Sequence, residues 1–223
     1  MSRRSTDRGP ATRPTEDALA QLARLGSATV YEGGGRGGYV DADLIQIVPG
    51  SKVAGPARTV RCGQDDNLMV HAAMAVVQPG DVLVVTMPEP APVALVGELL
   101  AVQAKLRGAA AVLVDASVRD VDELAGMGLP IWARWLRIKG ATKAHVGEID
   151  VPVTVGGADI RPGDVLVLDG DGAAVVAKER VDEVLAAALE REAREAVKRE
   201  RLEDGALSWE IDGLREKAER GDL

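Results

Sequence analysis

The stretch AVLVDASVRDVDEL, residues 111–124, is the strongest indication of the fold. Its first half is a run of Val, Leu and Ala, which is typical of a strand buried on both faces of a parallel sheet. Immediately upstream, residues 94–108 predict a helix from about Glu98 to Gly108, where glycine ends the helix. A helix followed by such a strand is typical of a βαβ unit, so we expect an α/β protein.

Strands and turns on either side extend this prediction. Residues 52–62 alternate and are rich in β-branched side chains, which predicts a strand. Pro-Gly-Asp occurs at 79–81 and again at 162–164, and each copy predicts a turn that leads into a buried strand. Residues 151–179 are rich in strands and contain a hairpin turn at 169–172. The sheet is therefore expected to be mixed.

The two ends of the chain differ from this central part. Residues 1–14 are polar and basic, and we expect a disordered tail because that composition buries too little surface to order itself. Residues 15–179 are expected to form the main domain, beginning with a helix capped by Thr15. Residues 180–223 are expected to be a charged helical extension that packs on its own domain or on a neighbouring subunit.

Composition excludes several functional classes. The net charge of −8 and a pI near 4.9 argue against nucleic acid as a partner, because nucleic-acid binders present a basic face. No run of 18 apolar residues predicts a membrane span. The one cysteine, Cys62, is expected to be a small core residue and fits a reducing compartment. With no secretory signal recognised in the basic N-terminal stretch, we expect a cytoplasmic protein.

A glycine-rich segment formally matches a dinucleotide-binding pattern. Gly33, Gly35 and Gly38 give the spacing G-x-G-x-x-G within GSATVYEGGGRGG. No clear strand precedes the segment and no helical pattern follows it, so we predict a flexible loop and not a dinucleotide site.

The candidate site is at the two ends of the central helix and strand. Gly97 stands at the predicted helix start, where free backbone N–H groups can bind a carboxylate or phosphate. Arg119 and Asp120 follow the strand, at the sheet edge where α/β proteins bind ligands. We expect Glu98, Arg119 and Asp120 to share one pocket, with oxygen ligands suited to Mg²⁺ or Mn²⁺. The alternative is that Arg119 and Asp120 are surface charges, or that Asp120 only caps the following helix.

Other reactive side chains give weaker signals. The seven lysines are Lys52, Lys105, Lys139, Lys143, Lys178, Lys198 and Lys217, and none is expected beside this site, which argues against Schiff-base chemistry. The two histidines, His71 and His145, form neither a zinc site nor a catalytic triad; His71 can still line the pocket.

The segment from Gly97 to Arg134, GELLAVQAKLRGAAAVLVDASVRDVDELAGMGLPIWAR, resembles the RraA-like family. The likeness extends over roughly residues 17–215 and is nearest to the class II pyruvate aldolases of that family. It implies a swivelling-type β/β/α sandwich with a long C-terminal helix, assembled as a homotrimer or hexamer. The implied activity is cleavage of 4-hydroxy-4-methyl-2-oxoglutarate or 4-carboxy-4-hydroxy-2-oxoadipate to pyruvate and a 2-keto acid, with oxaloacetate decarboxylation as a side activity.

The resemblance also implies roles for single residues. Asp120 would be a direct ligand of Mg²⁺ or Mn²⁺, and Glu98, where the family often has Asp, would bind the metal through water. Arg119 would bind the small-molecule 2-keto acid substrate, whose carboxylate would lie on the backbone of Gly97, Glu98, Leu99 and Leu100.

Two further residues are implied at a subunit boundary, because the family borrows a glutamate from the C-terminal helix of a neighbouring subunit. Glu195 is the candidate here, and Glu192 is the weaker one.

The family also contains a regulator that binds a ribonuclease and does no chemistry. In that branch, the resemblance implies, the Asp after the Arg and the long C-terminal helix are missing. This chain has Asp120 and a predicted helix over 180–203, which favours the enzyme. Binding of a ribonuclease stays as the alternative function.

Overall fold

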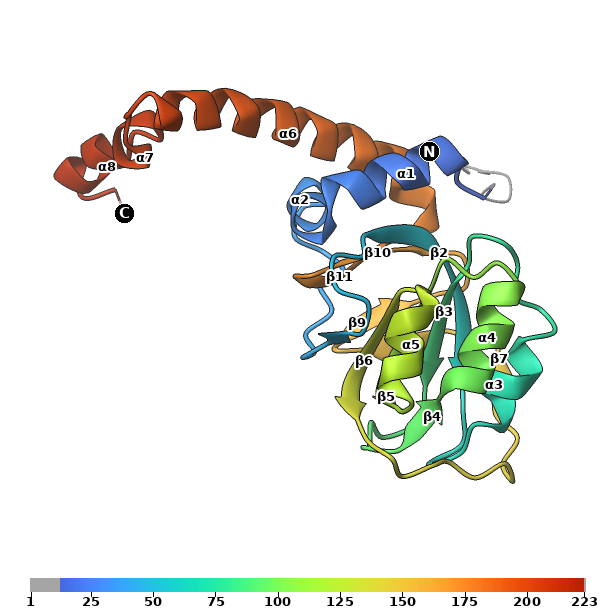
Figure 1. Ribbon diagram of the computed structural model, residues 1–223. Helices are drawn as coiled ribbons and strands as arrows, with labels where there is room; N and C mark the ends of the chain where they lie inside the picture. Colours follow the sequence, from blue (N-terminus) through green and yellow to red (C-terminus); the bar gives the residue numbers. More distant parts are fainter. Residues whose placement is uncertain (1–12, 223) are drawn as a thin grey trace, which may run out of the picture.

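A nine-stranded mixed sheet forms the centre of the structure, a computed structural model that describes residues 13–222 (Figure 1). Its strands are β1 (Ile45–Gln46), β2 (Val53–Arg61), β3 (Val82–Thr86), β4 (Ala94–Val96), β5 (Ala111–Val118), β6 (Ile131–Leu136), β7 (Glu148–Ile149), β10 (Val165–Asp169) and β11 (Gly172–Val176). Their order is β1-β6-β5-β3-β2-β10-β11, with β4 beside β5 and β7 beside β2. A separate hairpin consists of β8 (Val153–Val155) and β9 (Ala158–Ile160).

The parallel part of the sheet is the predicted βαβ region. β2 pairs with β3, β3 with β5, and β5 with both β4 and β6, all in parallel. Every residue of β5 is buried, as expected for a strand covered on both faces. The strand predicted over 52–62 and the hairpin at 169–172 are both confirmed, the latter by the antiparallel pairing of β10 with β11.

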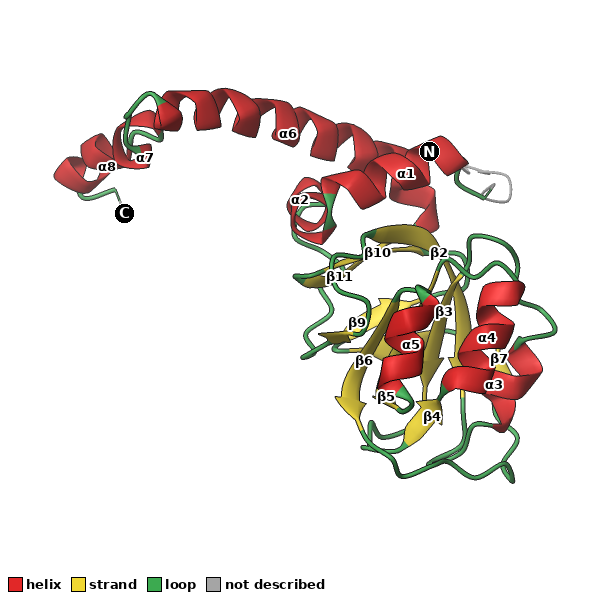
Figure 2. Ribbon diagram, in the orientation of Figure 1, coloured by secondary structure: helices red, strands yellow, loops and turns green. Residues whose placement is uncertain are grey.

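Two β layers and one helical layer make up the main body (Figure 2). Three helices cover one face of the sheet: α3 (Leu68–Ala73), α4 (Glu98–Leu106) and α5 (Val121–Met127). The β8–β9 hairpin covers the other face, where Trp132 is fully buried and its Nε1 donates a hydrogen bond to the Asp169 carbonyl. The predicted α/β sandwich is confirmed.

A third apolar cluster joins the curled end of the sheet to three more helices. These are α1 (Glu16–Leu25), α2 (Ser27–Gly33) and α6 (Val181–Glu203), and they pack on β10 and β11. The predicted cap is present, because the Thr15 hydroxyl accepts a hydrogen bond from Ala18 N at 3.2 Å. A short 3-10 helix (Lys178–Arg180) leads into α6.

The long C-terminal helix is also confirmed, and only its first part contacts the body. Val181, Val184 and Ala188 are buried against the neighbouring helices. Farther along, α6 extends away from the domain and ends beside α7 (Ser208–Ile211) and α8 (Leu214–Arg220) (Figure 1). Packing of this extension on a neighbouring subunit stays a prediction.

The prediction of a flexible loop over the glycine-rich segment is wrong at its beginning, because residues 27–33 form α2. The Asp169 carboxylate accepts hydrogen bonds from Ser27 N at 2.7 Å and from the Ser27 hydroxyl at 2.6 Å, which satisfies the start of this helix. Val30 is buried and Gly33 packs on Ala188 of α6. Tertiary contacts from β10 and α6 therefore stabilise a helix that local sequence does not indicate.

Two further predictions concern the N-terminal tail and a membrane span. The predicted tail at residues 1–14 lies outside the described residues except for Arg13 and Pro14, and Arg13 Nη1 lies 3.0 Å from the Asp81 carboxylate. Among the helices of residues 13–222, none combines the length and apolarity needed to cross a membrane.

Cys62 is a core residue, as predicted, and it is free. Burial raises the pKa of its thiol to about 12, so the thiol stays protonated at neutral pH. A protonated, buried thiol is a poor nucleophile, which argues against a chemical role for Cys62.

The contact of α2 with α6 leads to a stability prediction. A Cβ on Gly33 would lie 2.9 Å from both Cα and N of Ala188, so Gly33→Ala forces the two helices apart. We expect a loss of about 1–3 kcal/mol in the free energy of unfolding, measured by urea denaturation.

Gly126→Ala is the matched control for this change. Gly126 lies on the exposed side of α5 and its added Cβ would have nothing within 4 Å, so alanine there should stabilise the protein by about 0.5–1 kcal/mol. Equal unfolding midpoints for Gly33→Ala and wild type would contradict the packing described here.

Candidate active site

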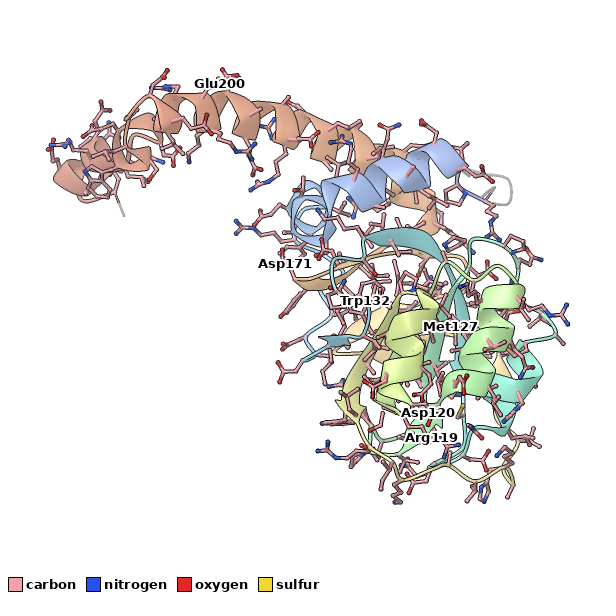
Figure 3. The ribbon with its side chains drawn as sticks, viewed as in Figure 1. Arg119, Asp120, Met127, Trp132, Asp171 and Glu200 are labelled. Atoms are coloured by element: carbon pink, nitrogen blue, oxygen red, sulfur yellow. The ribbon has the colours of Figure 1, made fainter. Side chains whose placement is uncertain are left out.

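A cavity of about 450 Å³ lies at the carboxyl ends of the parallel strands. The turn from β4 into α4 contributes Gly97 to its wall, and the turn from β5 into α5 contributes Arg119 and Asp120. The predicted residues Gly97, Glu98, Leu99, Leu100, Arg119 and Asp120 all line this one cavity. Figure 3 shows Arg119 and Asp120 side by side at the end of the domain that lies away from α6.

Asp120 stands at the start of α5 but its side chain does not cap that helix. Its backbone is left-handed, with φ of +61°, a conformation that Asp tolerates better than most residues. In this conformation the Asp120 carboxylate accepts a hydrogen bond from Glu98 N, the first residue of α4, at 3.0 Å. The interpretation of Asp120 as a simple cap of its own helix is therefore wrong: it caps the neighbouring helix.

Gly97 is required by this close approach. A Cβ at Gly97 would lie 2.6 Å from Oδ2 of Asp120 and 3.1 Å from Cγ of Arg119. Its φ of −136° is ordinary, so space and not backbone strain demands glycine here. The N–H groups of Leu99 and Leu100 lie in the first turn of α4 and have no partner within the helix, whereas Ala101 N already binds Gly97 O. They form the part of the predicted carboxylate site that Asp120 leaves open.

Arg119 holds its guanidinium at the cavity with few internal ties. Its Nε lies 3.7 Å from Oδ2 of Asp120, and about half of the side chain (49%) is exposed. Within residues 13–222 its guanidinium donates no hydrogen bond, which leaves its donors available to a ligand. A Cβ on Gly140 would lie 2.9 Å from Nη1 of Arg119, so a second glycine gives this guanidinium its room.

Residues from a distant part of the chain complete the wall. Asn67 and His71 of the α3 region and Lys143 of the loop after β6 line the same cavity. The expectation that no lysine lies beside the site is wrong for Lys143, because folding brings it next to α3. Partial burial and the Lys143 charge both lower the pKa of His71, so His71 is neutral at pH 7.

Asn67 leaves one buried polar atom without a partner. Its Nδ2 donates to the Leu95 carbonyl at 2.9 Å, which fixes the orientation of the amide. The Oδ1 atom is buried and has no hydrogen-bond donor within residues 13–222. Neither Asn67 nor Lys143 is marked by a local sequence motif, and only the tertiary fold identifies them.

The loop that carries Lys143 is fixed by Asp66. This fully buried carboxylate accepts hydrogen bonds from the Thr142 hydroxyl at 2.7 Å, Ala144 N at 2.6 Å and His145 N at 3.2 Å. It also accepts from Leu68 N at 2.8 Å, at the start of α3. Burial acts to raise the pKa of Asp66, but these hydrogen bonds outweigh it and hold the pKa far below the usual range.

Glu195 and Glu192 do not belong to this cavity within one chain. Glu195 pairs with Arg191 at 2.8 Å and Glu192 with Arg24 at 2.5 Å, both on the side of α6 that faces the N-terminal helices. α6 and the pair Arg119–Asp120 lie at opposite ends of the molecule (Figure 3). A role for either glutamate in this site requires a second copy of the chain.

The donor set matches a hard cation only in part. Asp120 and Glu98 offer carboxylate oxygens to the cavity, and Glu123 also lines it. Within residues 13–222 there is no group of three or more His, Cys, Asp or Glu side chains placed to hold a metal ion. Mg²⁺ commonly binds one or two protein carboxylates and keeps several waters, so these residues fit Mg²⁺ or Mn²⁺ and not Zn²⁺.

Comparisons with known proteins identify the family of the chain. The model of the RraA-like family, described as Aldolase/RraA, matches residues 22–175. A protein of Halalkalibacterium halodurans named "putative 4-hydroxy-4-methyl-2-oxoglutarate aldolase" is 35% identical over 157 residues, which cover 70% of this chain and 75% of that protein.

Solved structures share the fold. Streptomyces coelicolor RraAS2, described as an unusual member of the RNase ES inhibitor RraA protein family, has a TM-score of 0.75 at 33% identity, covering 85% of this chain and 99% of that one. An uncharacterized protein from Pseudomonas syringae pv. tomato has a TM-score of 0.80 at 23% identity, covering 91% and 96%.

The environment of Asp66 leads to a prediction on acid stability. Because its folded pKa is depressed, its contribution is complete above the unfolded pKa of about 3.9 and declines as pH falls below it. Asp66→Asn replaces one acceptor oxygen by an NH2 group, so some of the four donors lose their acceptor, which should cost about 1–3 kcal/mol at pH 7. Urea unfolding at pH 7 and pH 3 measures this: the difference between wild type and Asp66→Asn should shrink at pH 3. A difference that stays constant or grows on acidification would contradict the assignment.

Proposed function

The chain belongs to the RraA-like family, and on that premise we propose that it is a divalent-metal-dependent aldolase. Its substrate would be 4-hydroxy-4-methyl-2-oxoglutarate or 4-carboxy-4-hydroxy-2-oxoadipate, cleaved to pyruvate and a second 2-keto acid. One observation carries the proposal: the N-terminus of α4 faces the same cavity as the carboxylate of Asp120 and the guanidinium of Arg119, which donates no hydrogen bond within residues 13–222. The helix terminus and the guanidinium can bind an anionic 2-keto acid, the carboxylate can hold a cation, and the named relative supports this substrate class.

The pyruvyl half of the substrate would bind first. Its carboxylate would accept hydrogen bonds from Leu99 N and Leu100 N, where the α4 dipole favours negative charge. The Arg119 guanidinium would donate to the adjacent 2-keto oxygen. Together these donors fix the plane of the keto acid.

Cleavage breaks the C3–C4 bond of the bound substrate. The 4-hydroxyl gives its proton to a solvent water and becomes a carbonyl, while the bonding electron pair moves to C3 and onto the 2-keto oxygen as an enolate; solvent water later returns a proton to C3. Arg119 stabilises the negative charge that grows on this oxygen more strongly than it binds the ketone, which accelerates the step. Protonation at C3 then gives pyruvate. Oxaloacetate decarboxylation passes through the same enolate, so it is proposed as a side activity.

Asp120 and Glu98 are the residues that would hold the divalent cation, Mg²⁺ or Mn²⁺. When bound, the cation supplies positive charge beside the oxygens on which negative charge develops. We also propose that the chain assembles as a homotrimer or hexamer, in which Glu195 of a neighbouring copy completes the site.

A second candidate function is binding and inhibition of a ribonuclease. The likeness to Streptomyces coelicolor RraAS2, which covers nearly all of that protein, supports it. Incubation of a ribonuclease E-type endonuclease with a labelled RNA, with and without this protein, tests it. Slower RNA cleavage by a protein that releases no pyruvate from any hydroxy-keto acid would favour this second function over the aldolase.

Arg119→Lys tests the aldolase directly. Lysine keeps the charge but loses the planar fork of donors, so kcat/KM for pyruvate release should fall by about 100-fold or more. Pyruvate release from 4-hydroxy-4-methyl-2-oxoglutarate is followed by coupled NADH oxidation with lactate dehydrogenase. Arg107→Lys, on the exposed end of α4, is the control and should retain wild-type activity. Full activity of Arg119→Lys would overturn the role of Arg119.

Metal removal tests the second part of the proposal. EDTA treatment should abolish pyruvate release, and added Mg²⁺ or Mn²⁺ should restore it. Asp120→Asn should abolish it even with metal, because asparagine tolerates the left-handed backbone and can still accept from Glu98 N but lacks the charge. Asp122→Asn, in the exposed first turn of α5, is the matched control. Activity that persists in dialysed, EDTA-treated protein would rule out metal dependence.

A further inference from the structure

One wall of the cavity is formed by α3 and the loop after β6. No residue of this wall takes part in the proposed reaction. Lys143 is the one cation besides Arg119 among the described residues that line this cavity. Within residues 13–222 its ammonium group makes neither an ion pair nor a hydrogen bond. By contrast, Lys139 on the same loop lies 3.6 Å from the Asp65 carboxylate. A free cation in a cavity that is proposed to bind the pyruvyl carboxylate indicates a place for a second anionic group.

Hydrogen bonds to neighbouring segments fix the backbone of the loop around Lys143. Residues 142–145 supply three of the four hydrogen bonds that the buried Asp66 carboxylate accepts. Main-chain bonds from Asn67 N to Thr142 O at 3.0 Å and from Thr142 N to Asp65 O at 2.9 Å pair the loop with the start of α3. On the other side, Gly63 packs against His145, where a Cβ would lie 2.6 Å from the His145 Cβ. The Lys143 side chain itself is exposed, and the fixed backbone places its starting point at the cavity wall.

The proposed substrates have the matching chemistry. An oxoglutarate or oxoadipate skeleton carries a carboxylate beyond the bond that breaks, in addition to the one in its pyruvyl half. Arg119 and the N-terminus of α4 are assigned to the pyruvyl half in the proposed binding mode. The far carboxylate therefore needs a cation elsewhere on the wall, and His71 is neutral at pH 7.

We propose that Lys143 is the receptor for the second carboxylate of the substrate, and that Asp66 is a positioning residue that holds Lys143 over the cavity. This inference rests on the proposed function and adds to it a determinant of selectivity. It predicts that the protein distinguishes hydroxy-keto dicarboxylates from hydroxy-keto monocarboxylates by means of a residue outside the pyruvate site.

The test compares two substrates that differ only in this carboxylate. 4-Hydroxy-4-methyl-2-oxoglutarate carries it, and 4-hydroxy-2-oxopentanoate has hydrogen in its place; both release pyruvate on cleavage. In Lys143→Gln the ratio of kcat/KM for the dicarboxylate to that for the monocarboxylate should fall by about 10–100-fold, mainly through KM. Lys139→Gln is the matched control and should keep the wild-type ratio.

Asp66→Asn tests the positioning role. It should lower the same ratio, and the double variant with Lys143→Gln should lower it no further, because both changes remove one interaction. Asp66→Glu, which restores the charge, should recover part of the selectivity at a cost in stability. A ratio that Lys143→Gln leaves unchanged would overturn the inference, whatever the fate of the Asp66 variants.

The failure of this inference can be told from failure of the proposed function. Exchange of the pyruvate methyl protons with deuterium oxide, followed by NMR on the metal-loaded wild type, reports on the pyruvate site alone. No exchange together with no cleavage of either substrate would sink the aldolase and this inference with it. Exchange and cleavage with a ratio insensitive to Lys143 would sink the inference alone.

Discussion

The hydrogen bond from Glu98 N to the Asp120 carboxylate holds the candidate site together. It joins the first turn of α4 to the turn that follows β5, two segments that the parallel pairing of β4 with β5 brings to one edge of the sheet. Three features depend on it: the left-handed backbone of Asp120, the lack of a side chain at Gly97, and the position of Arg119 next to both. The same carboxylate that organises the helix terminus is the one expected to bind a cation. One carboxylate therefore has both a structural role and a proposed chemical role.

Buried aspartates do similar work elsewhere in the molecule. Asp66 fixes the loop that carries Lys143, Asp169 caps α2, and Asp164 accepts from the main chain of Arg161 and Lys178. Each accepts hydrogen bonds from backbone N–H groups at helix starts, turns or loops. These aspartates have more than one hydrogen-bond partner each. The Arg119 and Lys143 side chains in the cavity wall have few or no partners within the protein. A rigid anionic framework thus presents cations to an anionic ligand.

Sequence patterns predicted the parts of this arrangement that depend on local chemistry. The all-buried β5, the helix beginning at Glu98 and the cap at Thr15 follow from residue periodicity and capping preferences, and the structure has all three. The approach of Glu98 to Asp120 also followed, since parallel strands end at one edge of a sheet.

Other features depend on contacts between residues far apart in the chain, and local patterns do not contain them. α2 forms because Asp169 caps it from 142 residues away, so the glycine-rich sequence alone indicated a loop. The cavity position of Lys143 depends on Asp66, 78 residues from Ala144. That Asp120 caps α4 and not α5 follows from one left-handed residue, which helix propensity does not predict.

The most direct test of the candidate site is calorimetric binding of oxalate, a planar mimic of the pyruvate enolate, with Mg²⁺ present. We expect one oxalate per chain, bound at least about tenfold more weakly by Arg119→Lys. Wild-type protein that binds no oxalate, or equal affinity in the variant, would contradict the assignment of this site.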